Sequence, residues 1–295
     1  MPNTQVLKGR IKSVKNTKKI TKAMELVSAS KMRRAQQAAL RSRAYRNSAR
    51  EILNKLQLLE TDVTSPLLET RTVKTRLYIL ITSDRGLAGA YNSNVLKHFM
   101  KQLRRDAEDS VSSKVIVVGR KGAQFTARLE NIELLGVYTS WPDYPNSQDI
   151  APIMQEARAK FVDGSVDEVI GIFTDYQSSI NQVAVDQLLL PAQLGSEIDE
   201  QQQKQLADTV NNSLFEPTAQ AVFTEVVPKL VEAQVYQIFQ EAAASEQSMR
   251  MIAMKNASDN AGDLIDDLNL EYNSVRQSAI TQEIAEITGG AAAIS

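Results

Sequence analysis

The chain has 295 residues, of which 43% are hydrophobic, and it contains no cysteine and a single histidine, His98. This length can bury the core of one large domain or two modest ones, while the lack of thiols excludes disulfides, thiolate metal sites and cysteine nucleophiles. The net charge of −1 hides an asymmetry, because residues 1–60 hold 15 basic and three acidic side chains and the rest hold 19 basic and 32 acidic ones.

The first predicted element is one long helix over residues 4–59. No Gly or Pro follows Gly9 in this segment, and its apolar residues recur at steps of three and four, as in a coiled-coil seam. These residues form three groups: Leu7, Ile11, Val14; Ile20, Met24, Val27; and Tyr45, Ala49, Ile52, Leu56, Leu59. Such a helix spans about 80 Å at 1.5 Å per residue, so we expect it to need a partner helix.

The middle of the sequence predicts an α/β domain with a largely parallel, Rossmann-like sheet. Four short apolar runs rich in β-branched residues are expected to be buried strands: residues 76–82, 114–119, 167–175 and 182–190. Helical patterns separate them at about residues 93–108, 120–129 and 149–163. This alternation of strands and helices indicates parallel strands joined by crossover helices.

Residues 218–295 predict a second long helix. They hold 11 acidic and four basic side chains, and Pro228 and Gly262 are the only Pro and Gly before residue 289. Two apolar stripes follow the helical period: Phe223, Val227, Leu230, Val235, Ile238, Ala242; and Leu264, Leu268, Tyr272, Val275, Ile280, Ile284, Ile287. We expect a long antiparallel coiled coil of residues 1–60 and 218–295, with residues 61–217 as the α/β domain.

The residues predict no catalytic group, no metal site and no cofactor. Residues 82–90 (TSDRGLAGA) could present backbone N–H groups to a phosphate, but their spacing fits neither the dinucleotide fingerprint nor the phosphate loop. His98 has no nucleophile motif beside it, so we expect a surface or boundary residue. Two alternative functions stay open: a nucleotide-binding α/β enzyme, and a nucleic-acid-binding scaffold that uses the basic helix.

Residues 11–34 (IKSVKNTKKITKAMELVSASKMRR) closely resemble the N-terminal helix of the gamma subunit of rotary ATP synthases. Residues 83–87 (SDRGL) are similar to the loop that follows the first strand in that family. Residues 244–255, 276–283 and 290–293 resemble its terminal helix. The resemblance is to the bacterial type, because the cysteine-bearing regulatory insert of the chloroplast protein has no counterpart here.

The resemblance implies a non-catalytic rotor subunit in the central stalk, which transmits torque between a proton-driven membrane ring and the catalytic beta subunits. The implied partners are the alpha and beta subunits of the catalytic hexamer, the epsilon subunit and the membrane rotor ring. No nucleic acid and no direct membrane insertion are implied. The implied location is peripheral, on the cytoplasmic face of the bacterial cell membrane.

The resemblance also implies subunit contacts that couple rotation to catalysis, at Met24, Arg85, Arg276, Gln277, Thr281 and Glu283. From the residues alone, Met24 fits plain coiled-coil packing, and the cluster at residues 276–283 fits a solvated helix face. The resemblance instead implies that this cluster contacts a beta-subunit loop in one rotary position. Contacts with the rotor ring would be expected in residues 191–216, where the match is weak.

Overall fold

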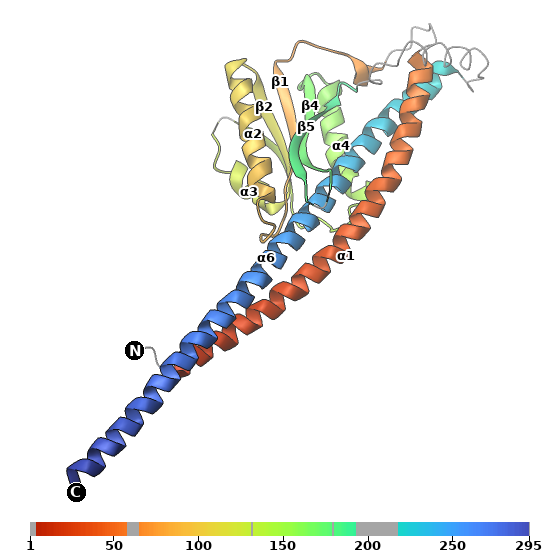
Figure 1. Ribbon diagram of the computed structural model, residues 1–295. Helices are drawn as coiled ribbons and strands as arrows, with labels where there is room; N and C mark the ends of the chain where they lie inside the picture. The colour runs from red at the N-terminus through yellow and green to blue at the C-terminus, as the bar shows by residue number, and fades with distance from the viewer. Residues whose placement is uncertain (1–3, 58–64, 131, 179, 193–217, 295) are drawn as a thin grey trace. The chain divides into compact units, whose positions relative to one another are not determined.

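The computed structural model describes residues 4–57, 65–130, 132–178, 180–192 and 218–294 (Figure 1). It divides into a coiled-coil unit (residues 1–29 and 250–295) and a sheet unit (residues 30–249), and each is described by itself. Two long helices, α1 (Thr4–Gln57) and α6 (Ala219–Ile294), contribute to both units. The predicted domain boundaries at residues 60 and 217 lie outside the described ranges, so that division stays a prediction.

The sheet unit contains a five-stranded sheet of order β3-β2-β1-β4-β5. The pairs β1·β2, β2·β3 and β1·β4 are parallel, and β5 is antiparallel to β4. The strands are β1 (Thr75–Ile81), β2 (Ser112–Val118), β3 (Glu133–Tyr138), β4 (Glu168–Tyr176) and β5 (Gln182–Leu190). The predicted largely parallel sheet is therefore confirmed.

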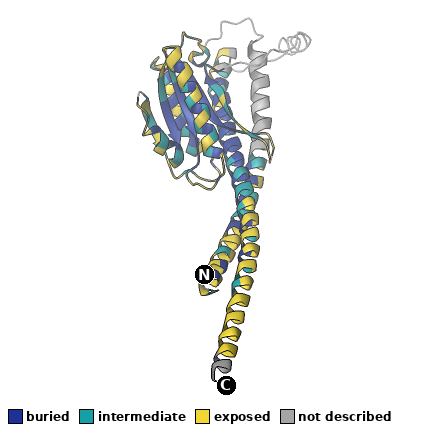
Figure 2. Ribbon diagram, turned by 60° about the vertical axis from the view of Figure 1, so that its left-hand side comes forward, coloured by how far each residue is buried: buried dark blue, intermediate teal, exposed yellow. Residues whose placement is uncertain are grey.

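Both faces of the sheet are covered, which explains why its central strands are continuous apolar runs. Along β1, Tyr78 and Leu80 join a core with Val95 and Phe99 of one helix, whereas Leu77 and Ile79 join the other core. Figure 2 shows the strands as buried. The helices of the sheet unit are α2 (Tyr91–Glu108), α3 (Arg120–Thr126) and α4 (Ser147–Val162), with the short 3-10 helix η1 (Pro66–Leu68) before β1.

The edge strand β3 was not predicted from the sequence. Its apolar residues are interrupted by Gly136, and Leu134 and Val137 are exposed. The strand pairs with β2 alone and buries little of either face. An edge strand of this kind lacks the apolar run that marked the buried strands.

The part of α6 in the sheet unit is buried on nearly all sides from residue 230 onward. Its predicted apolar stripe is confirmed, because Val227, Leu230, Val235, Ile238 and Ala242 all lie in the larger core. The side chain of Phe223 lies outside the described part. A helix that is buried all round must be covered by several elements.

A buried polar network joins β1 to the end of α2. The carboxylate of Asp106 is almost fully buried, and it accepts hydrogen bonds from the Tyr78 hydroxyl (2.6 Å), the Ser113 hydroxyl (2.8 Å) and the Arg76 guanidinium. Arg76 also donates to Glu168 (2.5 Å). Burial raises the pKa of Tyr78, and the hydrogen bond to Asp106 raises it further. Each of the buried polar side chains in this network therefore has a partner.

In the coiled-coil unit, α1 and α6 pair antiparallel, as predicted. Leu7 and Ile11 pack with Leu268, together with Val14, Tyr272 and Val275, which are half-buried. Farther along α1, the Nζ atom of Lys18 lies beside Gly262. Residues later in α1 therefore lie beside residues earlier in α6, as in an antiparallel pair of helices.

The seam on α1 differs from the prediction in its second group. Ile20 is 60% exposed and Val27 is 54% exposed, whereas Thr21 and Ser28 are buried. The seam begins with Leu7, Ile11 and Val14. If the same alternating steps of four and three residues continue along the helix, Thr21 and Ser28 fall in the seam and Ile20 and Val27 do not. The prediction was therefore wrong for Ile20 and Val27, whereas Met24 is half-buried at the border of the seam. The side chains of the third group, residues 45–59, lie outside the described part.

Truncating a seam residue should cost more stability than truncating an outward one. Leu7→Ala is expected to lower the free energy of unfolding by about 2–5 kcal/mol, since Leu7 is fully buried and its removal leaves a cavity. Ile20→Ala is expected to change it by less than about 0.5 kcal/mol. Denaturant unfolding followed by far-ultraviolet circular dichroism measures both values, and equal losses would contradict the seam.

Candidate functional site

The loop between β1 and α2 carries Arg85, one of the predicted contact residues. The carboxylate of Asp84 accepts hydrogen bonds from the backbone N–H groups of Arg120 (2.9 Å) and Trp141 (2.5 Å). These two amides lie just after β2 and β3 respectively, so Asp84 ties together three turns at the carboxyl ends of neighbouring strands. Arg85 itself is exposed. The loop is thus a fixed platform that presents Arg85 to solvent.

Two backbone amides at this edge of the sheet, one at the start of the loop and one in the turn after β2, are bonded to side chains. The backbone N–H of Ser83 donates to the Asn92 side chain (3.0 Å), and that of Arg120 donates to Asp84. A phosphate cradle needs such N–H groups directed at the ligand. Here both are used by protein side chains, which favours a structural or protein-binding role for the loop.

Leu87 in this loop is a feature that the sequence analysis missed. Its φ angle is +63° and its side chain is 64% exposed. A left-handed backbone costs a non-glycine residue roughly 1–2 kcal/mol, and burial of the side chain does not offset this cost. A strained backbone that holds a large apolar side chain in solvent is a feature of contact sites.

The other predicted polar contact residues lie together on the exposed end of α6. Arg276, Gln277, Thr281 and Glu283 are all exposed. The Thr281 hydroxyl donates to the Gln277 carbonyl at 2.9 Å, one helical turn away. All side chains from residue 276 to residue 289 are exposed, and Figure 2 shows this stretch in yellow. These polar groups are therefore accessible to another protein.

An exposed apolar stripe runs along the same end of α6. Ile280, Ile284 and Ile287 are 47%, 57% and 72% exposed. They follow steps of four and three, but the partly buried seam residues end at Val275. The expectation that one seam runs from Leu264 through Ile287 was therefore wrong, because Leu264 is exposed as well. Three exposed isoleucines along one face of a solvated helix indicate a surface that another molecule covers.

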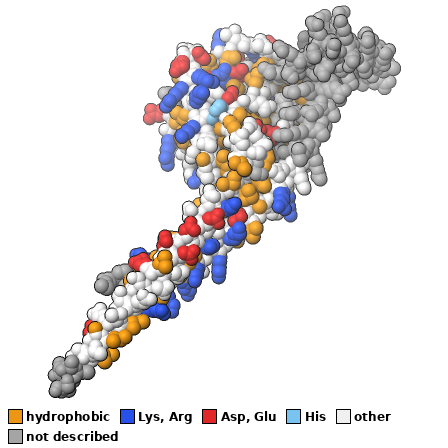
Figure 3. Space-filling model, viewed as in Figure 1, with side chains coloured by type: hydrophobic (Ala, Val, Ile, Leu, Met, Phe, Trp, Pro, Cys, Tyr) orange, Lys and Arg blue, Asp and Glu red, His pale blue; other side chains and the backbone are white. Residues whose placement is uncertain are grey.

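Met24 lies at the border between the seam of α1 and its outward face. Its side chain is half-buried, while Ile20, Leu26 and Val27 around it are exposed. Lys22 forms an ion pair with Glu25 at 2.9 Å on the same stretch. Figure 3 shows apolar side chains among charged ones on the long helices. Met24 is thus accessible from outside the helix pair.

His98 is a half-buried boundary residue, as predicted. Its Nε2 atom lies 2.6 Å from a carboxylate oxygen of Asp186, which also accepts a hydrogen bond from the Gln102 amide at 2.8 Å.

Within the described ranges, no cluster of three or more His, Cys, Asp or Glu residues could hold a metal ion. In the same ranges, no helix combines the length and apolar character needed to cross a membrane.

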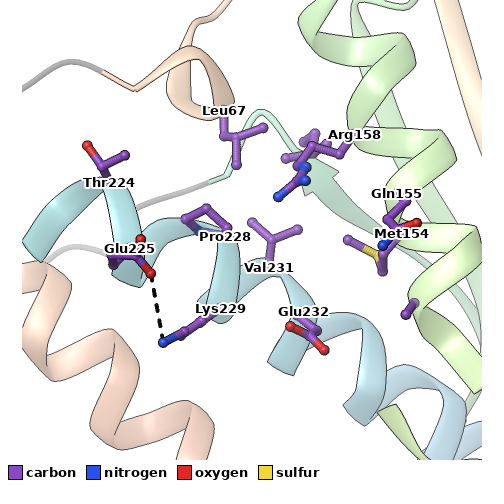
Figure 4. Close-up of a pocket in the computed structure, with 12 residues that line it drawn as sticks. Leu67, Met154, Gln155, Arg158, Thr224, Glu225, Pro228, Lys229, Val231 and Glu232 are labelled. Carbon is purple, nitrogen blue, oxygen red and sulfur yellow. Dashed lines mark ion pairs between the residues drawn. The ribbon is translucent and has the colours of Figure 1, made fainter. Parts of the chain in front are cut away.

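A cavity of about 560 Å³ lies between α4 and the Pro228 turn of α6 (Figure 4). Leu67, Met154 and Val231 supply part of its apolar lining. Its charged lining is mixed, with Arg158, Lys229, Glu225 and Glu232, and Lys229 lies 4.0 Å from Glu225. The lining is therefore mixed in charge, with two basic and two acidic side chains beside the apolar ones.

Comparisons with known proteins show the family of the chain. The family model described as "ATP synthase" matches residues 3–294. The ATP synthase gamma chain of Acidithiobacillus ferrooxidans is 42% identical over 295 residues, covering all of both chains. That of Psychrobacter cryohalolentis is 38% identical over 297 residues, again covering all of both chains.

Two solved assemblies contain similar chains. One comes from the central stalk and c-ring of the Tetrahymena thermophila mitochondrial ATP synthase, with a TM-score of 0.58, 25% identity, and coverage of 81% of this chain and 99% of that one. The other comes from the Euglena gracilis mitochondrial enzyme, with a TM-score of 0.67, 18% identity, and coverage of 99% and 94%; it supports the fold alone. By its full-length similarity to gamma chains, this protein belongs to the ATP synthase family.

Proposed function

We propose that this chain is the central-stalk rotor subunit of an ATP synthase. In this role it is non-catalytic and carries torque between a proton-driven membrane ring and the catalytic beta subunits. The observation that carries the proposal is full-length similarity to gamma chains, combined with a helix pair whose far end is solvated yet bears an apolar stripe. Such a surface requires a surrounding partner.

The proposed partners are the alpha and beta subunits around the helix pair, and the epsilon subunit and membrane ring at the sheet unit. We place the chain peripherally, on the cytoplasmic face of a bacterial cell membrane. The segment where ring contacts are expected, residues 191–216, lies almost wholly outside the described part of the chain. No contact residue is therefore assigned there.

The proposed mechanism is differential contact. The helix pair has no rotational symmetry, since α1 is basic with exposed Ile20 and Val27, while α6 has its own exposed stripe. A surrounding subunit therefore meets a different surface at each rotor angle. Contacts that favour one conformation of that subunit over another change its equilibrium by their difference in free energy. Rotation thereby sets which state each catalytic subunit prefers.

The polar cluster on α6 suits a contact that forms and breaks on every turn. Arg276 offers a planar set of donors, and the Gln277 amide both donates and accepts. The Thr281 hydroxyl already donates to the Gln277 carbonyl, so it offers its lone pairs to a partner. Bonds of about 0.5–1.5 kcal/mol each bias one position without locking it. Glu283, and Arg85 with Leu87 on the loop after β1, are proposed as further contacts.

The two alternative functions have less support. The backbone amides of Ser83 in the loop and of Arg120 in the turn after β2 are bonded to Asn92 and Asp84, so neither is directed at a phosphate. The matching family model and the similar curated chains name an ATP synthase rather than a nucleic-acid-binding protein.

The proposal is tested by affinity purification of the tagged chain from native membranes. We expect alpha and beta subunits to co-purify in fixed stoichiometry, with ATP hydrolysis by the complex and none by the isolated chain. An untagged strain controls for non-specific capture. Recovery of the chain without alpha and beta subunits would overturn the proposed function.

Met24→Lys is expected to assemble but to couple hydrolysis poorly to proton pumping. The substitution adds an ammonium on a surface that already holds Lys18, Lys19 and Lys22, and this group can form a charge-assisted bond of about 1.5–3 kcal/mol with a partner carboxylate. Proton pumping per ATP hydrolysed, measured in inverted membrane vesicles, reports the effect. Met24→Leu is the matched control, and wild-type coupling in the lysine variant would mean that Met24 serves helix packing only.

Gln277→Leu and Thr281→Val are each expected to lower turnover of the assembled enzyme severalfold. Each removes hydrogen bonds worth about 0.5–1.5 kcal/mol from the proposed contact. Single-molecule rotation should show a changed dwell at one angular position. Ser278→Ala is the control, because Ser278 also makes a one-turn hydroxyl bond on the exposed helix but lies outside the proposed set. Dwell times equal to the control's would make these residues an ordinary solvated face.

A further inference from the structure

The exposed side of α2 carries a row of basic side chains: Lys97, Lys101, Arg104 and Arg105. We call these four residues the cationic row. Lys97, Lys101 and Arg104 follow the spacing i, i+4, i+7, so they lie along one face of the helix over about 10 Å. Figure 3 shows basic side chains gathered beside the pale-blue histidine on this surface.

The sheet unit supplies no ion pair for this row. Among the described residues, the ion pairs within 4.0 Å join other side chains. The nearby carboxylate of Asp106 is bound to Arg76, Tyr78 and Ser113, and that of Asp186 accepts from His98 and Gln102. Arg105 donates a hydrogen bond of 3.4 Å to the Gln102 side chain, which is neutral, so this bond neutralises none of the charges of the row.

The arrangement is unfavourable for α2 alone. Lys97 and Lys101 are like charges four residues apart, and so are Lys101 and Arg105, and such pairs destabilise a helix. The negative end of the helix dipole offsets this cost for Arg104 and Arg105, and so do Glu108 and Asp109, which lie four residues after them. It does not reach Lys97 and Lys101 in the middle of the helix. An external acidic surface would relieve the repulsion along the whole row.

We infer that the cationic row binds an acidic surface of another subunit in the assembly, one that places Asp or Glu side chains opposite the row. A helix that binds a lipid surface needs large apolar side chains beside its basic ones. On α2, Val95 and Phe99 are buried in the core, and Leu96 and Leu103 pack against it. The polar character of the face thus favours a protein partner. The inference rests on the proposed function only for the identity of the assembly.

The test uses the intact, purified assembly and a carbodiimide, which joins a lysine amine to a carboxylate in direct contact. Mass spectrometry is expected to find Lys97 or Lys101 linked to an acidic residue of one other subunit. The variant Lys97→Glu/Lys101→Glu/Arg104→Glu should lose that cross-link. It should also release the same subunit at a NaCl concentration about twofold lower or less, since contacts between charged surfaces are salt-sensitive.

A matched control reverses three exposed basic residues elsewhere on the sheet unit: Lys74→Glu/Arg128→Glu/Arg158→Glu. This variant should keep the cross-link and the wild-type salt tolerance. The inference is overturned if the intact assembly gives no inter-subunit link from Lys97 or Lys101. It is also overturned if the wild-type chain, but not the row variant, binds vesicles of anionic phosphatidylglycerol while no such link forms. Failure to co-purify with alpha and beta subunits would instead overturn the proposed function.

Discussion

A helix of 76 residues is stable only where its apolar side chains are covered, and α6 meets this constraint in three ways along its length. From residue 230 to residue 250 the helix is buried on nearly every side, between residues 254 and 275 it is covered along one seam, and from residue 276 to residue 289 its side chains are all exposed. The described residues supply less cover at each step, and they leave the last part uncovered. The placement of the proposed contacts follows from this gradient.

Much of the fold could be predicted because burial leaves a direct signal in the sequence. Strands β1, β2 and β4 are covered on both faces and therefore read as apolar runs, whereas the edge strand β3, with Gly136 and two exposed apolar residues, left no such signal. The phase of the seam was harder to predict. Ile20, Met24 and Val27 have the spacing of a seam, but the same spacing also describes a stripe that faces another protein. Only the continuation from Leu7 and Ile11 through Thr21 and Ser28 distinguishes the two.

Part of the candidate site could likewise be predicted from the sequence, and part of it could not. The predicted residues Arg276, Gln277, Thr281 and Glu283 came from a resemblance, and the structure places all four on an accessible helix end. Their contacts remain a proposal, because one chain shows which side chains are accessible but does not show which partner residues they meet. Leu87 could not be predicted, because a positive φ angle at a non-glycine residue arises from the surrounding loop. The Asp84 tethers that fix that loop join residues 36 and 57 positions apart, beyond the reach of local patterns.

The exposed isoleucines of α6 also bear on the life of the chain before assembly. A free copy displays Ile280, Ile284 and Ile287 to solvent, and a surface of this kind promotes aggregation and attracts chaperones and proteases. Copies made in excess of their partners are therefore the ones that quality control removes. If the proposed partner subunits cover this stripe, we expect the abundance of the protein in a cell to follow the supply of those subunits.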